Sequence, residues 1–219
     1  VNFHPADMNT LDRPASPHMI TETIHHRTKP HQSTFETTQK NLSRIKWNLF
    51  HWRDPFVFQF QSRWYMVLGG QQWFPRRGII LLYTSSDLSS WRFLKVLVHG
   101  TKAMKKPWEC PNFLDFGETQ MLLISPMGQT HYLLGKFTEE SFIPLPTAPN
   151  WQIFDYGKDF YAPQVFANIP ADYLQLPPEV PRDSTNPQKY LLFGWIKGGG
   201  RKSNCGWNGC FSLPRTVFP

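Results

Sequence analysis

A motif that recurs about every 50 residues is the feature that most constrains how this chain can fold. An acidic residue opens an apolar, strand-like run at Asp54, at Glu109 and at Asp159. The two intervals are 55 residues (109 − 54) and 50 residues (159 − 109). A repeat of this length with about four strands per unit is typical of the blades of a β-propeller. Because the first strand of each blade lines the central axis, we expect the three carboxylates to converge there.

Short apolar runs separated by turn residues fill each repeat and predict antiparallel strands. The first repeat has strands at 56–60, 63–68, 79–84 and 91–96, the second at 112–116, 120–125 and 131–137, and the third at 160–166 and 190–195. The 18 Phe and 9 Trp residues favour strands, where aromatic rings pack on pleated surfaces. We therefore predict an all-β fold of four-stranded antiparallel blades.

Two segments do not fit the strand pattern. Residues 1–45 are rich in His, Thr, Pro and Gln and show no sustained apolar period, so we interpret them as an irregular N-terminal segment. Their histidines have irregular spacing and no cysteine lies among them, which argues against a metal site. The Pro-rich stretch 169–189 is interpreted as a surface loop within the propeller domain, which we place at 46–219.

Composition excludes several functional classes. The net charge is +7, but the Lys and Arg residues are scattered and form no nucleic-acid motif, so we expect no nucleic-acid partner. No run approaches the roughly 18 apolar residues of a membrane span, so we expect no membrane partner. Three cysteines without a CxxC pair do not suggest zinc. A pairing of Cys205 with Cys210 stays open beside two independent thiols.

Convergent carboxylates suit the cleavage of glycosidic bonds. In that reaction one carboxylic acid protonates the leaving oxygen, and a second carboxylate attacks the anomeric carbon or stabilises its positive charge. The alternative is that Asp54, Glu109 and Asp159 only cap turns at the beginning of strands. Spacing alone does not separate the two interpretations.

Three sequence blocks stand out, WRDPFVF at 52–58, WECPNF at 108–113 and DYGKDFYAPQVF at 155–166. Together they resemble glycoside hydrolase family 32, which includes invertases, inulinases and other β-fructofuranosidases. A fourth block, GWNGCFSLPR at 206–215, is similar to a later motif of that family. The resemblance implies a partial five-bladed β-propeller that hydrolyses sucrose or fructans by retaining double displacement, without a metal or organic cofactor.

The resemblance also implies roles for individual residues. Glu109 would be the general acid/base, and Asp54 would bind fructosyl hydroxyls and stabilise the transition state, with Arg53 holding carboxylate and sugar oxygens in place. Four further residues are candidates for contact with the substrate, the first two as a sugar-recognition pair and the last two as aromatic walls, with packing in the core as the alternative for the last two. They are Asp155, Lys158, Trp108 and Trp195.

One departure from the family pattern concerns the nucleophile. The family carries it in a Trp-x-Asn-Asp-Pro-Asn-Gly block, and residues 1–50 do not reproduce that block, so no nucleophile is nominated. We expect the first blade and a C-terminal β-sandwich to be missing from this chain. The two hypotheses are an incomplete β-fructofuranosidase and a non-catalytic fructoside-binding propeller or decaying gene product. The resemblance favours an extracellular or vacuolar location, and the oligomeric state is left undetermined.

Overall fold

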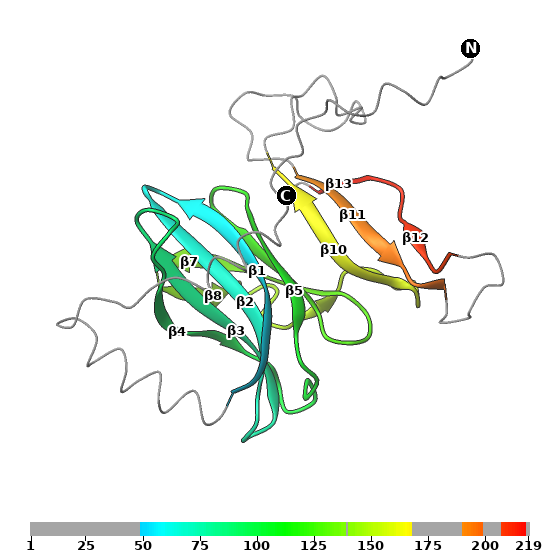
Figure 1. Ribbon diagram of the computed structural model, residues 1–219, viewed down its shortest axis with the longest axis horizontal. Coiled ribbons are helices and arrows are strands. Elements are labelled where there is room, and N and C mark those ends of the chain that lie inside the picture. Colours follow the sequence, from blue (N-terminus) through cyan, green and yellow to red (C-terminus); the bar gives the residue numbers. More distant parts are fainter. Residues whose placement is uncertain (1–48, 139, 168–189, 199–206, 218–219) are drawn as a thin grey trace, which may run out of the picture.

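Three antiparallel sheets make up the described part of the chain, which covers residues 49–138, 140–167, 190–198 and 207–217 of the computed structural model (Figure 1). Each sheet is built mainly from strands that are consecutive in the sequence. Consecutive antiparallel strands need only short turns, and the turn residues found between the apolar runs supply them.

The first sheet has the strand order β1-β2-β3-β4. Its strands are β1 (Leu49–Phe60), β2 (Arg63–Gln72), β3 (Arg77–Ser85) and β4 (Arg92–His99). The hairpin between β1 and β2 pairs Phe60 with Arg63, and Gln61 in the turn adopts a left-handed conformation with φ 54°. The sequence prediction of four strands in this repeat is confirmed.

The second sheet has the order β5-β6-β7-β8, and a short fifth strand also pairs with β7. The strands are β5 (Glu109–Asp115), β6 (Gln120–Ser125), β7 (His131–Thr138), β8 (Ser141–Pro144) and β9 (Gln152–Ile153). The first three were predicted from the sequence. The sequence analysis missed β8 and β9 because they are only four and two residues long and contain Pro, Gln and Ser.

The third sheet is formed by β10 (Phe160–Phe166), β11 (Tyr190–Ile196), β12 (Cys210–Phe211) and β13 (Arg215–Val217). Both β12 and β13 pair with β11, at different points along its length. The predicted strands at 160–166 and 190–195 are confirmed. The predicted irregular segment 1–45 and the predicted loop 169–189 lie outside the described residues.

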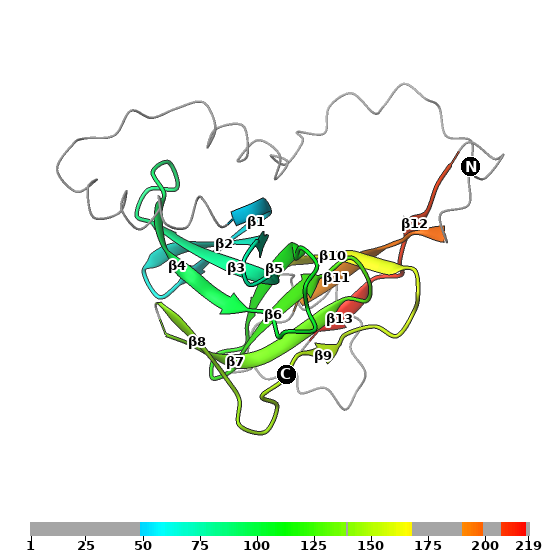
Figure 2. The ribbon, with the colours of Figure 1, turned by 90° about the horizontal axis from the view of Figure 1, so that it is seen from below.

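The three sheets pack side by side as adjacent blades, with β1, β5 and β10 in neighbouring positions (Figure 2). An aromatic cluster joins the first two blades, where the rings of Phe58 and Phe113 stack with centroids 3.8 Å apart. A second cluster, which includes Leu114, Phe160 and Leu192, joins the second blade to the third. The arrangement is that of a partial β-propeller, as expected. Within the described residues, no helix is long and apolar enough to cross a membrane.

Gly78 provides a test of how closely the first two blades pack. A Cβ atom at this position would lie 2.2 Å from Nε1 of the buried Trp108 indole. We expect Gly78→Ala to lower the free energy of unfolding by about 1–3 kcal/mol, because the added methyl group would overpack the interior against Trp108. The measurement is urea denaturation against Gly128→Ala, where the nearest atom to the added Cβ lies at 4.0 Å. Equal stabilities of the two variants would contradict this packing.

Candidate active site

Each of the three innermost strands carries the same irregularity in its pairing. The register shifts between residues 53 and 56 in β1, 109 and 112 in β5, and 161 and 164 in β10. At each shift a residue adopts a left-handed conformation, with φ 57° at Asp54, 46° at Cys110 and 47° at Ala162. A proline follows each of these residues. A β-bulge tolerates proline because the inserted residues leave the hydrogen-bonded ladder.

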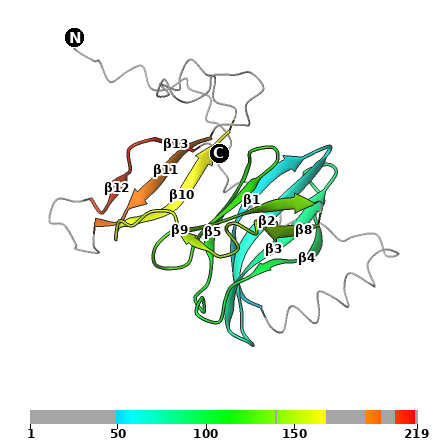
Figure 3. The same cartoon turned by 180° about the vertical axis from the view of Figure 1, so that it is seen from behind.

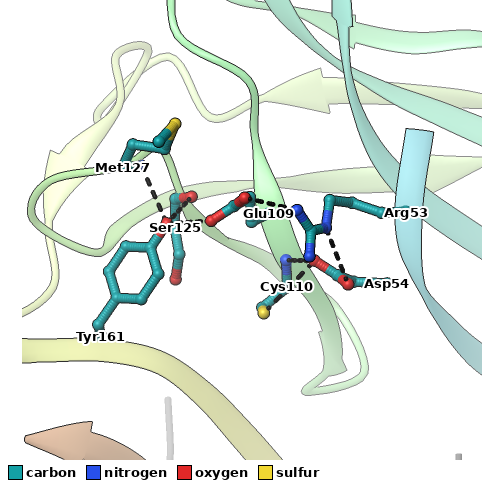
Figure 4. A network of polar contacts seen from close by, with 7 residues as sticks. All are labelled: Arg53, Asp54, Glu109, Cys110, Ser125, Met127 and Tyr161. Atoms are coloured by element: carbon teal, nitrogen blue, oxygen red, sulfur yellow. Dashed lines mark hydrogen bonds and ion pairs between the residues drawn. The ribbon is translucent and has the colours of Figure 1, made fainter. Parts of the chain in front are cut away.

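The repeated bulge brings three side chains together from three different blades. Arg53, Glu109 and Tyr161 each stand directly before the left-handed residue of their strand, and their polar ends meet in one network (Figure 4). Left-handed conformations at residues other than glycine are costly and cluster at functional sites. The bulges therefore mark the place where the blades build a shared site.

Glu109 is held between a cation and a hydroxyl group. Arg53 Nη1 lies 3.0 Å from Glu109 Oε1, and the Tyr161 hydroxyl lies 2.5 Å from Glu109 Oε2. The Glu109 side chain is 17% exposed, so it is largely shielded from water but open on one side. A carboxyl group with both oxygens oriented in this way is suited to proton transfer with a bound molecule.

Asp54 is positioned by groups from two blades. Its Oδ1 lies 3.3 Å from Arg53 Nε, and its Oδ2 accepts a hydrogen bond of 2.9 Å from the backbone N–H of Cys110. The Cys110 thiol is a weaker donor to the same oxygen at 3.5 Å. The negative charge of Asp54 raises the pKa of the Arg53 guanidinium, with a smaller contribution from Glu109. Arg53 thus stays charged and links the two carboxylates.

The Tyr161 hydroxyl has a choice of acceptors. Besides Glu109, it lies 3.0 Å from the carbonyl oxygen of Ser125, and it accepts a hydrogen bond from the backbone N–H of Met127. Since a hydroxyl group donates one proton, it donates to Glu109 when that group is ionised. When Glu109 carries the proton, the hydroxyl can turn to Ser125 and accept from Glu109. The site therefore accommodates both protonation states of Glu109.

Burial and a hydrogen bond keep Tyr161 itself in the neutral form. Desolvation raises the pKa of its phenol above the usual range, and the hydrogen bond to Glu109 raises it further. The ammonium group of Lys197 lies over the face of the Tyr161 ring, 4.3 Å from its centroid, in a cation–π contact. The phenol thus remains a donor throughout the neutral pH range.

Asn112 joins the bulges of the second and third blades. Its buried side-chain amide donates to the carbonyl oxygens of Cys110 and Pro163, and its Oδ1 accepts from the backbone N–H of Val165. A buried amide with three protein partners fixes the relative position of the two strands. The alignment of Glu109 with Tyr161 therefore depends on a residue that contributes no reactive group.

Asp155 and Lys158, two of the remaining predicted site residues, lie on the loop before β10. The Asp155 carboxylate is paired with Arg215 of β13 and accepts from the backbone N–H of Gly157. Lys158 is exposed on the same loop, before β10. Their expected role in recognising the sugar stays a prediction. The backbone carbonyl oxygen of Asp159 accepts a hydrogen bond from the backbone N–H of Lys197. The residue of the third blade that contacts Glu109 is Tyr161.

The two predicted aromatic walls differ in their exposure. Trp108 is completely buried, packed against Trp151, Gly78 and Gly100, so its expected role as a wall for the substrate is wrong. Trp108 directly precedes β5, and its indole fills the interior of the interface between the first two blades. Trp195 is 42% exposed and lies opposite Tyr161 in the pairing of β10 with β11. It remains a candidate wall.

Sequence analysis missed Tyr161, although a signal was available. Aligning the repeats on acidic residues paired Glu109 with Asp159. Aligning them on the prolines Pro55, Pro111 and Pro163 would have placed Tyr161 in register with Arg53 and Glu109. The proline marks the bulge and hence the residue whose side chain reaches the site.

The reactivity of the Cys110 thiol reports on the burial and charge of the site. Burial, together with the neighbouring Asp54, raises its pKa from 9.0 to about 12. Only the thiolate reacts with alkylating reagents, so at pH 8 we expect Cys110 to be modified at least about tenfold more slowly than the exposed Cys210. Peptide mapping by mass spectrometry after iodoacetamide treatment measures both rates. Equal rates in the native protein, together with faster labelling after unfolding, would contradict the environment described here.

No group of three metal-ligating side chains occurs among the residues with described positions. The network offers a carboxyl group that can exchange a proton, Glu109, and a second carboxylate, Asp54, with Arg53 as the cation between them. Glycoside hydrolases act through such a pair of carboxyl groups.

Comparisons with known proteins identify the family. The model of the glycosyl hydrolases family 32 N-terminal domain matches residues 18–218, and this chain belongs to glycoside hydrolase family 32. Sucrose-6-phosphate hydrolase of Zymomonas mobilis is 30% identical over 192 residues, which cover 76% of this chain and 33% of the relative. Raffinose invertase of Escherichia coli is 29% identical over 182 residues, or 78% of this chain and 35% of the relative.

A solved structure agrees with these matches. The β-fructofuranosidase of Bombyx mori superposes with a TM-score of 0.58 at 28% identity, over 75% of this chain and 34% of the silkworm enzyme. A variant of that enzyme has been solved in complex with sucrose. This chain thus spans about a third of the length of the relatives it matches.

Proposed function

We propose that residues 46–219 form part of the catalytic propeller of a β-fructofuranosidase, which hydrolyses the fructosidic bond of sucrose or fructans. The observation that carries this proposal is the position of Glu109, held between Arg53 and Tyr161 where three blades meet. The names of the relatives support it, since they act on sucrose-6-phosphate or are invertases and fructofuranosidases.

In this proposal each residue of the network has one role. Glu109 protonates the oxygen of the leaving sugar and then removes a proton from the attacking water. The Asp54 carboxylate accepts hydrogen bonds from fructosyl hydroxyls and stabilises positive charge at the anomeric carbon. Arg53 orients both carboxylates, and Tyr161 positions Glu109 in both of its protonation states.

A retaining reaction also needs a nucleophilic carboxylate on the other side of the sugar ring. Neither Asp54 nor any other carboxylate among the described residues is assigned that role. A second candidate function keeps the sugar-contacting residues and has the propeller bind fructosides without cleaving them.

The experiment that separates the two candidates is an assay of fructose release from sucrose. The full-length protein containing this chain is expected to release fructose with net retention of configuration, followed by NMR. The 219-residue chain alone is expected to show no turnover, because retaining hydrolysis needs both carboxylates. Binding of sucrose by the full-length protein without fructose release would favour the non-catalytic alternative.

A further inference from the structure

A close backbone contact between the first two blades lies directly before Glu109. In this part of the structure β5 runs beside β1 and β2 (Figure 3). The backbone N–H of Trp108 donates to the carbonyl oxygen of Gly70 at 3.1 Å. A Cβ atom at the neighbouring Gly69 would overlap the carbonyl oxygen of Trp108 and lie 3.3 Å from the Glu109 nitrogen. The peptide that joins Trp108 to Glu109 therefore lies against the backbone of β2.

Gly69 is also the β2 partner of the arginine that contacts Glu109. It pairs with Arg53 in the ladder between β1 and β2. Residues that are paired in antiparallel strands present their side chains to the same face of the sheet. The face of Gly69 that contacts the peptide before Glu109 is thus the face from which Arg53 reaches the Glu109 carboxylate at 3.0 Å. A side chain at residue 69 would widen the space across which these two charged groups meet.

The indole of Trp108 is held in a slot of matching shape. It is completely buried in the cluster that joins the first two blades. Two glycines leave room for the ring, since a Cβ atom at Gly78 would overlap Nε1 and one at Gly100 would lie 2.9 Å from Cζ2. The ring of Trp151 packs against the indole edge to face, with centroids 4.9 Å apart. Nε1 has no hydrogen-bond partner among the described residues, so close packing holds the ring.

Hydrogen bonds tie the segment before Trp108 to the first blade. The buried Gln71 side chain donates to the carbonyl oxygen of Lys105, and the backbone N–H of Gly78 donates to the carbonyl oxygen of Met104 at 2.9 Å. Both donors belong to β2 and β3, the central strands of their sheet. The segment is therefore attached to the part of the blade that is paired on both sides.

We propose that Trp108 and Gly69 are positioning residues that set the distance between Glu109 and Arg53. The proposal rests on the proposed function. Trp108 fixes the peptide through its ring, and Gly69 lets that peptide approach β2. Proton transfer needs the acid within hydrogen-bond reach of the leaving oxygen, and a displacement of about 1 Å can slow a reaction about 10²-fold. A shift of the peptide is thus expected to slow the chemical step and to leave the affinity for the substrate nearly unchanged.

The test is the kinetics of fructose release from sucrose by two variants of the full-length protein, Trp108→Phe and Gly69→Ala. The smaller ring leaves part of the slot empty, and the added methyl group pushes the peptide away from β2. Each variant is expected to lower kcat by about 10–100-fold while KM stays within about twofold of the wild-type value. Rates are divided by the concentration of folded protein, which circular dichroism measures.

The matched control is Phe93→Leu. Phe93 is a buried aromatic residue of a separate cluster, which is formed by the alternate residues of β2 and β3 on the opposite face of the first sheet. This variant should lose stability, as Trp108→Phe does, and keep the kcat of the wild type. Folded Trp108→Phe and Gly69→Ala proteins that also keep their kcat would overturn the proposal and leave the proposed function standing.

A second measurement separates this proposal from the function on which it rests. If the wild-type full-length protein releases no fructose, the proposed function fails, and the alkylation rate of the Cys110 thiol then tests the positioning of the bulge. Trp108→Phe is expected to raise this rate severalfold, because the strand that carries Glu109 and Cys110 loses its anchor. Phe93→Leu should leave the rate unchanged. A Cys110 rate that Trp108→Phe does not change would, in that case, overturn the proposal.

Discussion

Replacing Glu109 with glutamine should lower kcat for sucrose about 10²–10⁴-fold in the full-length protein. The amide keeps an oxygen that can accept from Tyr161, but it cannot supply the proton that the leaving sugar needs. The substitution is nearly isosteric, so the fold should be preserved. Initial rates of fructose release at saturating sucrose measure the effect.

The control for this variant is Glu118→Gln, which removes the same charge from an exposed position outside the network. It should retain full activity and an unchanged melting temperature. A Glu109→Gln protein that folds normally and keeps its kcat would show that another group provides the acid, and the assignment made here would be wrong.

Replacing Asp54 with asparagine should lower kcat/KM about 10²–10³-fold, because the negative charge that stabilises the transition state is lost. The amide oxygen can still accept the backbone N–H of Cys110, which now lies 2.9 Å from Oδ2, so the bulge should persist. Arg53 would keep Glu109 as its remaining carboxylate partner. Steady-state kinetics on sucrose, with circular dichroism as a check on folding, measure the change.

The Asp54→Asn result also bears on the turn-cap interpretation considered from the sequence. A residue that only caps a strand would affect the melting temperature and leave the catalytic constants of the folded protein unchanged. A loss of thermal stability with normal kcat/KM would therefore support that interpretation and contradict the catalytic one.

Most of the fold was predictable because its strands carry a local signal. The runs at 120–125 and 160–166 have the bounds observed for β6 and β10, since both are apolar and bordered by turn residues. The observed β1 begins at Leu49, seven residues before the predicted start at 56, because a bulge with a proline lies in its middle. From the sequence alone, a proline predicts the end of a strand, so the predicted strand began after Pro55.

Site residues were predicted only where a motif marked them directly. The RDP and ECP blocks identified Arg53, Asp54 and Glu109, and the structure brings all three together. Tyr161 and Asn112 were missed because their roles arise from contacts between blades, which strand periodicity does not encode. Trp108 was assigned to the substrate as a candidate aromatic wall, but its indole is buried in the core between the first two blades.

The central claim is that Glu109 acts as the acid and that Asp54 does not. The most direct measurement compares first-turnover rates on sucrose and on a nitrophenyl β-fructofuranoside, whose leaving group departs without protonation. The account predicts that Glu109→Gln loses far more activity on sucrose than on the nitrophenyl fructoside, whereas Asp54→Asn loses similar activity on both. An equal loss on the two substrates in the Glu109→Gln protein would contradict the account.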